Sequence, residues 1–339
     1  MANGIIAFIG LIIILYIGRP IFVPVAVAAF LWYLINAVAA YLRRILPMRE
    51  SIAAGLVALT GACAIMFGIV VLFVMQIKPA ATALIARLPE IQLQLASLQS
   101  HFSDWLGVSL NAVALPKLAN IGLSLGASIA AIGTAAGMVL IYMLFMFVEQ
   151  STFSHKLSAM FPNARKFSKM KFIINSIDSN MKRFMAVKTF TSALDGILAY
   201  AWLSWMGLEF AGVWGFLVFI LNFIPTFGSW IACAMPIIYA AISFGTLNEV
   251  LLVAGGLIGL QLLVGNILDP KLTGDKLNLS TLAILINLVF WGMIWGVAGM
   301  FFSVPLLVAI FVITAQFDAT RWIAVMLSAN GQIPDKNED

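Results

Sequence analysis

Polar side chains occur at a few points inside long apolar segments, and these are the points where chemistry could take place. Asp195 is the only carboxylate deep within a predicted membrane span. A carboxylate at that depth is costly unless it faces protein, water or an ion. Asp195 is therefore a candidate proton or cation site. The alternative is a structural carboxylate, capped by Thr191 or Ser192 or paired with a lysine.

A second candidate site lies where a proline and a glycine interrupt an apolar segment, at Asn222, Pro225 and Gly228. Broken helical backbone frees carbonyl and amide groups, and Asn222 adds a carboxamide. Such groups can ligate a cation or hydrogen-bond a polyol. The alternative is a kink whose polar groups are satisfied by neighbouring helices.

A third candidate site follows the next apolar segment. Gln261, Asn266 and Asp269 have spacings that can share one face of a helix end, and Asn287 lies on the following segment. We expect these side chains to line a pathway and the segment to end at Asp269-Pro270. The alternative makes Asp269-Pro270 a turn and uses Gln261 and Asn266 for interhelical hydrogen bonds.

The composition indicates what must position these residues. Hydrophobic residues make up 63% of the chain and charged residues 10%, and the mean hydropathy is +1.05. Soluble domains carry about 25% charged residues. We therefore predict an all-α polytopic integral membrane protein. It has about eight hydrophobic segments, and broken or re-entrant helices occur in its C-terminal half.

The hydrophobic pattern divides the chain into membrane segments and polar connections. The predicted parts are N-terminal membrane helices at 1–77, an extracytoplasmic amphipathic segment at 78–120, a membrane helix at 121–148, a basic cytoplasmic helical loop at 149–185, a C-terminal membrane core at 186–320 and a polar cytoplasmic tail at 321–339. The apolar runs at 211–244 and 282–315 exceed one span of about 20 residues. Each is either a kinked, tilted helix or a re-entrant hairpin.

The basic residues set the predicted orientation. Lysines and arginines concentrate between Glu149 and Lys188, and loops rich in Lys and Arg stay in the cytoplasm. Both termini are then cytoplasmic. The helix from Arg165 to Met185 is either solvated or lies on the bilayer surface, where anionic headgroups would attract it. Because the positive charge concentrates in a loop between membrane segments, we do not expect a nucleic acid partner.

The sequence offers little for catalysis. Cys63 and Cys233 lie inside apolar segments and lack the neighbouring ligands of a metal site. No Gly-rich phosphate-binding loop indicates ATP-driven transport. We expect no enzymatic activity, no catalytic residue, no cofactor and no metal centre.

Several motifs are similar to those of a known family. They are VWGFLVFILNFIPTFGS (Val213 to Ser229), GNILDPKLTGDKLNLSTL (Gly265 to Leu282), FWGMIWGVAGMFFSVPL (Phe290 to Leu306) and VKTFTSALDG (Val187 to Gly196). Together with Pro24, Tyr33 and Asn36, they resemble the autoinducer-2 exporter (AI-2E) family of permeases, over nearly the whole chain. Asp195 departs from the pattern, because many relatives have a threonine there.

This resemblance implies a multi-pass protein of the bacterial inner (plasma) membrane that acts as a carrier and forms homo-oligomers, with pentamers as the expected form. It implies export of a small polar molecule such as the quorum-sensing signal autoinducer-2, possible coupling to an ion gradient, or sodium(lithium)/proton antiport. The partners are then a small-molecule or monovalent-cation substrate and the lipid bilayer. An oligomeric channel or membrane scaffold is the alternative from another class.

Overall fold

The computed structural model describes residues 2–45, 135–273 and 278–333, with single positions between 60 and 75. Regular structure in these residues is helical, apart from one isolated bridge between Leu279 and Ser328. The all-α prediction is confirmed. The predicted amphipathic segment at 78–120 and most of the third hydrophobic segment lie outside the described residues.

The N-terminal segment divides where the sequence predicts a break. Helix α1 spans Ala2–Ile17 and helix α2 spans Arg19–Ile45, and the two meet at Gly18. A helix at Ala135–Gln150 follows later in the chain. The remaining helices are α5 (Phe153–Met160), α6 (Ala164–Trp205), α7 (Ala211–Leu221), α8 (Phe227–Phe244), α9 (Leu247–Gln261), the π-helix η1 (Leu262–Leu268), α10 (Asp269–Thr273), α11 (Thr281–Trp295), α12 (Val297–Gln316), the short 3₁₀ helix η3 (Asp318–Thr320) and α13 (Arg321–Leu327).

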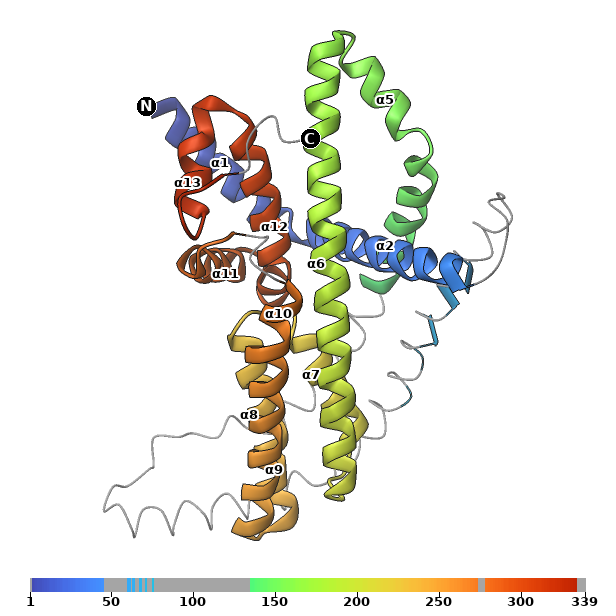
Figure 1. Ribbon diagram of the computed structural model, residues 1–339, viewed down its shortest axis with the longest axis vertical. Helices are drawn as coiled ribbons and strands as arrows, with labels where there is room; N and C mark the ends of the chain where they lie inside the picture. The colour runs from blue at the N-terminus through green and yellow to red at the C-terminus, as the bar shows by residue number, and fades with distance from the viewer. Residues whose placement is uncertain are drawn as a thin grey trace.

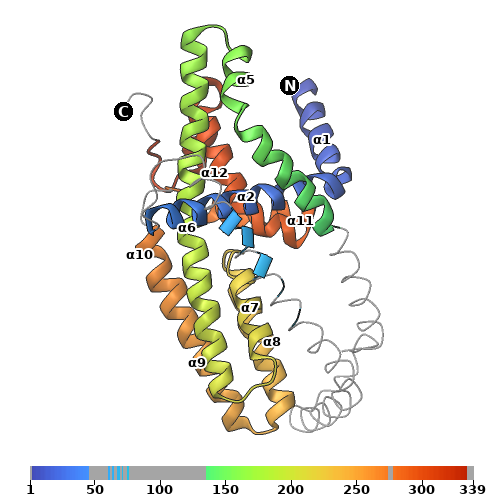
Figure 2. The same cartoon turned by 90° about the vertical axis from the view of Figure 1, so that its right-hand side faces the viewer.

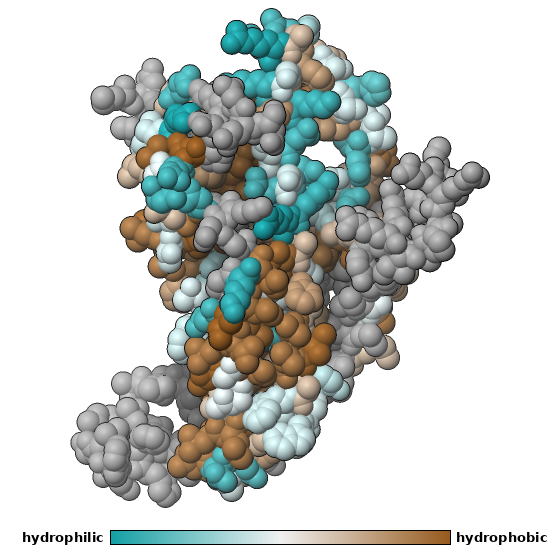
Figure 3. All heavy atoms as spheres, viewed as in Figure 1, coloured by the Kyte–Doolittle hydropathy of each residue, from teal (hydrophilic) through white to brown (hydrophobic). Residues whose placement is uncertain are grey.

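Three described helices are long and apolar enough to cross a membrane: Arg19–Ala39 within α2, Leu247–Leu268, and Val297–Gln316. A fourth is possible where Ala135–Gln150 and Phe153–Met160 form a bent pair. Hydrophilic residues gather where α6 begins, and apolar residues cover the lower half around α8 and α9 (Figure 3). This is the architecture of a polytopic membrane protein.

Helix α6 is the longest described element, with 42 residues. At about 1.5 Å per residue it is about 63 Å long, twice the hydrocarbon core of a bilayer. It begins at Ala164, directly after the N-cap residue Asn163, whose side chain accepts hydrogen bonds from two backbone amides. It runs the length of the molecule (Figure 1). The predicted basic helix is thus joined without a break to the segment that carries Asp195.

The basic half of α6 is not solvated on every side. Ile173, Met181 and Met185 are buried at intervals that keep them on one face of the helix. Ile177 and Phe184 on the same face pack against the cluster of apolar side chains on α12. This half of α6 therefore supports α12, while its lysines and arginines remain exposed, and Lys169 Nζ lies over the Phe317 ring that follows α12.

The first over-long apolar run is a helix hairpin. Helices α7 and α8 pack against each other and reverse direction at Asn222–Thr226 (Figure 2). The turn is tight, because Thr226 has φ of 61° and the Phe227 N–H donates to the Pro225 carbonyl at 2.6 Å. A Cβ on Gly228 would lie 1.8 Å from the Leu221 carbonyl oxygen, so only glycine fits there.

The second over-long run is also a hairpin. Helices α11 and α12 pack together, and the chain reverses at Gly296, with φ of 65°. A Cβ on Gly299 would lie 1.9 Å from the Trp291 carbonyl oxygen. Asn287 Nδ2 donates to the Ser303 carbonyl at 2.5 Å and joins the two arms. Both long runs are hairpins rather than kinked spans.

The candidate span Leu247–Leu268 ends directly before Asp269-Pro270, as expected, but the chain does not leave the helical conformation there. Helix α9 continues through η1 into α10, which ends at Thr273. Proline lacks an N–H donor, but the first turn of a helix does not need one. Pro270 lies in the first turn of α10, at the point where the wider turns of η1 end.

Candidate functional site

The α7–α8 turn, the π-helix and the middle of α6 line a partly open cavity of about 450 Å³. Its walls are largely apolar. The lining residues are Phe184, Lys188, Asn222, Phe223, Ile224, Pro225, Thr226, Ser229, Trp230, Cys233, Ile258, Gln261, Leu262, Gly265, Asn266, Asp269, Ile284 and Val304. Segments that lie far apart in the sequence therefore contribute polar side chains to one cavity.

Five residues of the predicted site line this cavity, namely Asn222, Pro225, Gln261, Asn266 and Asp269. They come from the α7–α8 turn and from the α9–η1–α10 helix, which were predicted as separate candidates. The structure brings these two candidates together.

Gly228 and Asn287 do not line the cavity. Gly228 lies under the α7–α8 turn and allows it to close. Asn287 holds the α11–α12 hairpin, because its Oδ1 also accepts from Trp291 Nε1 at 3.1 Å. Both residues position helices that surround the cavity.

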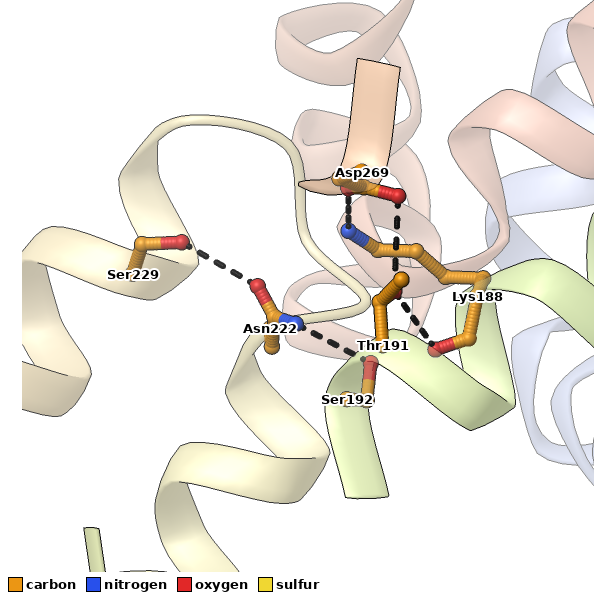
Figure 4. A network of polar contacts seen from close by, with 6 residues as sticks. All are labelled: Lys188, Thr191, Ser192, Asn222, Ser229 and Asp269. Atoms are coloured by element: carbon orange, nitrogen blue, oxygen red, sulfur yellow. Dashed lines mark hydrogen bonds and ion pairs between the residues drawn. The ribbon is translucent and has the colours of Figure 1, made fainter. Parts of the chain in front are cut away.

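Asn222 is the centre of a hydrogen-bonded chain across three helices. Its side chain is 3% exposed. Asn222 Nδ2 donates to Ser192 Oγ of α6 at 3.2 Å, and Ser229 Oγ of α8 donates to Asn222 Oδ1 at 3.4 Å (Figure 4). The carboxamide fixes the α7–α8 turn against α6.

A half-buried ion pair joins α6 to the start of α10. Lys188 Nζ lies 2.7 Å from Asp269 Oδ2, and the two side chains are 13% and 21% exposed. Thr191 Oγ1 lies 3.3 Å from Asp269 Oδ1 and from the Lys188 carbonyl (Figure 4). Lys188 and Asp269 both line the cavity, so one wall carries a neutralised pair of charges.

Lys188, Ser192 and Ser229 were not predicted as site residues. Lys188 stands at the end of a run of exposed lysines and arginines and was counted with them. The available signal was its position, because it is the one residue of that run that falls within the predicted membrane segment at 186–320, as its third residue. A lysine at such a position needs a carboxylate partner.

Asp195 lies on the buried face of α6 and is not among the residues that line the cavity. It is 2% exposed, and its Oδ2 has no hydrogen-bond partner among the described residues. The sequence analysis left two structural alternatives for Asp195, capping by Thr191 or Ser192 and pairing with a lysine. Neither alternative applies to Oδ2. Lys188 pairs with Asp269, Thr191 bonds Lys188 and Asp269, and Ser192 accepts from Asn222.

The described residues contain no group of three or more His, Cys, Asp or Glu side chains that could hold a metal ion. The site instead offers three carboxamides, two hydroxyls and an ion pair within mainly apolar walls. Such a cavity is suited to holding a small polar molecule by directional hydrogen bonds.

A cavity between broken helices of a polytopic membrane protein is the arrangement found in secondary transporters. The comparison with known families agrees with this class. A family model described as "AI-2E family transporter" matches residues 5–319, and the chain belongs to this family.

Individual relatives are also named for transport. "AI-2 transport protein TqsA" of Escherichia coli (strain K12) is 38% identical over 191 residues, which are 56% of this chain and 54% of that protein. A "Putative transport protein" of Borreliella burgdorferi is 33% identical over 204 residues, 59% of this chain and 56% of that protein. The matched part spans about half the length of these curated relatives.

Proposed function

We propose that the protein exports a small polar molecule of the autoinducer-2 type, and that this cargo binds in the cavity at the α7–α8 turn. The cavity itself is the observation that carries the proposal. About 450 Å³ is within the range of small-ligand sites, roughly 300–1,000 Å³.

The polar groups of the cavity favour an uncharged, hydroxylated cargo. Asn222, Gln261 and Asn266 provide both hydrogen-bond donors and acceptors. Lys188 and Asp269 neutralise each other, so the wall offers no unpaired charge to a cargo ion. The name of the Escherichia coli relative points to the same kind of cargo.

We also propose that the protein lies in the bacterial inner membrane with both termini in the cytoplasm. Helices α1, α5 and α13 lie toward the end where α6 begins (Figures 1 and 2). That end of α6 carries the exposed lysines and arginines, which favour the cytoplasm. Exposed apolar side chains on α8, α9 and α11 can face lipid or further copies in a homo-oligomer, of which the pentamer is the expected form.

A sodium(lithium)/proton antiporter is the second candidate, favoured by the buried, unpartnered carboxylate oxygen of Asp195. Antiport needs an acid that alternates between two cations within the membrane. An oligomeric channel or scaffold is the remaining candidate, and it requires neither the cavity nor Asp195.

A flux measurement distinguishes these candidates. Inverted membrane vesicles that contain the protein should accumulate autoinducer-2 with saturable kinetics. Asn222→Ala should lower cargo affinity about tenfold, because cargo hydrogen bonds and the turn are both lost. Asn180→Ala is the matched control, since within the described residues the Asn180 side chain bonds only the Ser176 carbonyl of its own helix.

Wild-type transport by Asn222→Ala would contradict the proposed cavity. Sodium-driven proton movement without accumulation of autoinducer-2 would establish the antiporter instead. Unsaturable flux would indicate a channel, and no flux of either kind would indicate a scaffold.

A further inference from the structure

The π-helix η1 leaves a backbone carbonyl at the cavity without its usual donors. In an α-helix each carbonyl accepts from the N–H four residues later, and in a π-helix from the N–H five residues later. For Gly265 these two residues are Asp269 and Pro270. The Asp269 N–H donates to the Val264 carbonyl instead, and proline has no N–H. The Gly265 carbonyl therefore lacks both of its helical donors.

The side chain of Gln261, four residues earlier, is also available for a ligand. Its carboxamide has no hydrogen-bond partner among the described residues. Gln261 Nε2 lies 2.7 Å from the point that a Cβ on Gly265 would occupy, so the carboxamide lies directly against the Gly265 backbone. Both residues line the cavity, and glycine can contribute only backbone atoms to its wall. An N–H donor and a carbonyl acceptor are thus side by side.

The contacts of Asp269 hold this arrangement in place. Asp269 is bound by Lys188 Nζ at 2.7 Å and lies 3.3 Å from Thr191 Oγ1 (Figure 4). These contacts tie the start of α10 to α6 and anchor the residue whose N–H serves Val264. Groups that are held in position before a ligand arrives lose less entropy when it binds.

We propose that the Gln261 carboxamide and the Gly265 carbonyl form a subsite for one hydroxyl group of the cargo. A hydroxyl can accept a hydrogen bond from Gln261 Nε2 and donate one to the Gly265 oxygen. An ether or a ketone accepts but cannot donate, and would leave the Gly265 oxygen unpaired. The subsite therefore selects alcohols. This inference rests on the proposed export of a hydroxylated molecule and adds the group that recognises its hydroxyl.

The test is the Kd of the purified protein for autoinducer-2 and for analogues in which each hydroxyl in turn is replaced by hydrogen. In the wild type, one analogue should bind about tenfold more weakly than autoinducer-2, because two hydrogen bonds are lost. Gln261→Met removes the donor, and Pro270→Ala supplies an N–H that can occupy the Gly265 carbonyl. Each variant should weaken autoinducer-2 binding about fourfold.

The decisive readout is the ratio of the two Kd values within each protein. In Gln261→Met and in Pro270→Ala this ratio should fall to about threefold, because part of the subsite for the hydroxyl is already gone. A general disturbance of the helix would weaken both ligands equally and keep the wild-type ratio, which would overturn the proposal. Pro24→Ala restores an N–H inside α2, away from the cavity lining, and should keep the ratio.

Two further comparisons keep the test decisive. If Pro270→Ala does not fold, Gln261→Met decides, because it leaves the backbone of η1 unchanged. If autoinducer-2 does not bind, glycerol and propylene glycol, which lacks one hydroxyl of glycerol, form the second pair of ligands. Equal Kd values for the two members of this pair, or no binding of either, would overturn the subsite.

Flux measurements keep this proposal and the export function apart. Transport of autoinducer-2 with an unchanged Kd ratio in both variants would refute only the hydroxyl subsite. Hydroxyl-dependent binding that both variants weaken, without transport by the wild type, would refute only the export function.

Discussion

At the scale of single residues, the Lys188–Asp269 pair differs from the other ion pairs of the described chain. Its side chains are 13% and 21% exposed, whereas those of Lys182 and Asp178 are 54% and 35% exposed. Removing one partner of a shielded pair leaves a charge without compensation. Exposed pairs contribute little, because water and salt screen them.

Lys188→Ala should therefore lower the free energy of unfolding by about 2 kcal/mol, while Lys182→Ala should change it by less than about 0.5 kcal/mol. Denaturant titration in detergent micelles measures both values. The double variant Lys188→Ala/Asp269→Ala should recover part of the loss. Equal losses for Lys188→Ala and Lys182→Ala would show that the first pair is not shielded.

Sequence patterns located much of the candidate site. Asn222 and Pro225 were predicted from a polar residue beside a helix break, and Asn266 and Asp269 from polar groups at the end of an apolar run. The contacts that join them were not predictable, because Lys188 and Asp269 are 81 positions apart. Such a pairing depends on how α6 packs against α10, which no local pattern specifies.

At the scale of helices, small residues set how closely α6 and α7 approach. A Cβ on Gly196 would lie 2.7 Å from the Gly215 carbonyl oxygen, and one on Gly215 would lie 2.7 Å from the Gly196 carbonyl oxygen. Without a hydrophobic effect between helices in lipid, close packing of this kind drives association. This contact lies one residue from Asp195 and one turn from Ser192.

Gly196→Ala should lower the free energy of unfolding by about 1–3 kcal/mol, because the helices must separate, and it should also impair transport. Gly255→Ala is the matched control, since a Cβ there meets nothing within 4 Å. It should be neutral or stabilising, as alanine favours a helix. Thermal unfolding of both variants tests this, and similar losses would contradict close packing at Gly196.

Element boundaries were predictable where proline and glycine interrupt apolar runs, but the path of the chain was not. A break at Pro225 or Gly296 is compatible with a kink and with a hairpin, and long-range packing decides. The two runs also share a Trp-Gly pair before a proline. Gly215 lies in the middle of α7, whereas Gly296 lies at the turn between α11 and α12, so the shared pattern does not mark equivalent positions.

At the scale of the whole molecule, α6 connects the basic end to the cavity. One face of its first half packs against α12, and its second half carries Lys188, Ser192 and Asp195. The α7–α8 hairpin and the α9–η1–α10 helix meet it from other sides. A movement of α6 would therefore reach the ion pair, the helix break and the cavity together.

The central claim is that cargo occupies the cavity at the α7–α8 turn, and Cys233 provides a direct probe. The chain has two cysteines, and Cys233 lines the cavity. In a Cys63→Ser protein in membrane vesicles, the measurement is the rate at which a small methanethiosulfonate reagent modifies Cys233. A Cys63→Ser/Cys233→Ser protein with Ser158→Cys on the exposed surface of α5 is the control.

Autoinducer-2 at about ten times its Kd should slow the modification of Cys233 about tenfold, because occupied protein is shielded, and should leave the Ser158→Cys control unchanged. An unchanged rate at Cys233, in vesicles that transport the cargo, would show that the cargo crosses the protein by another route.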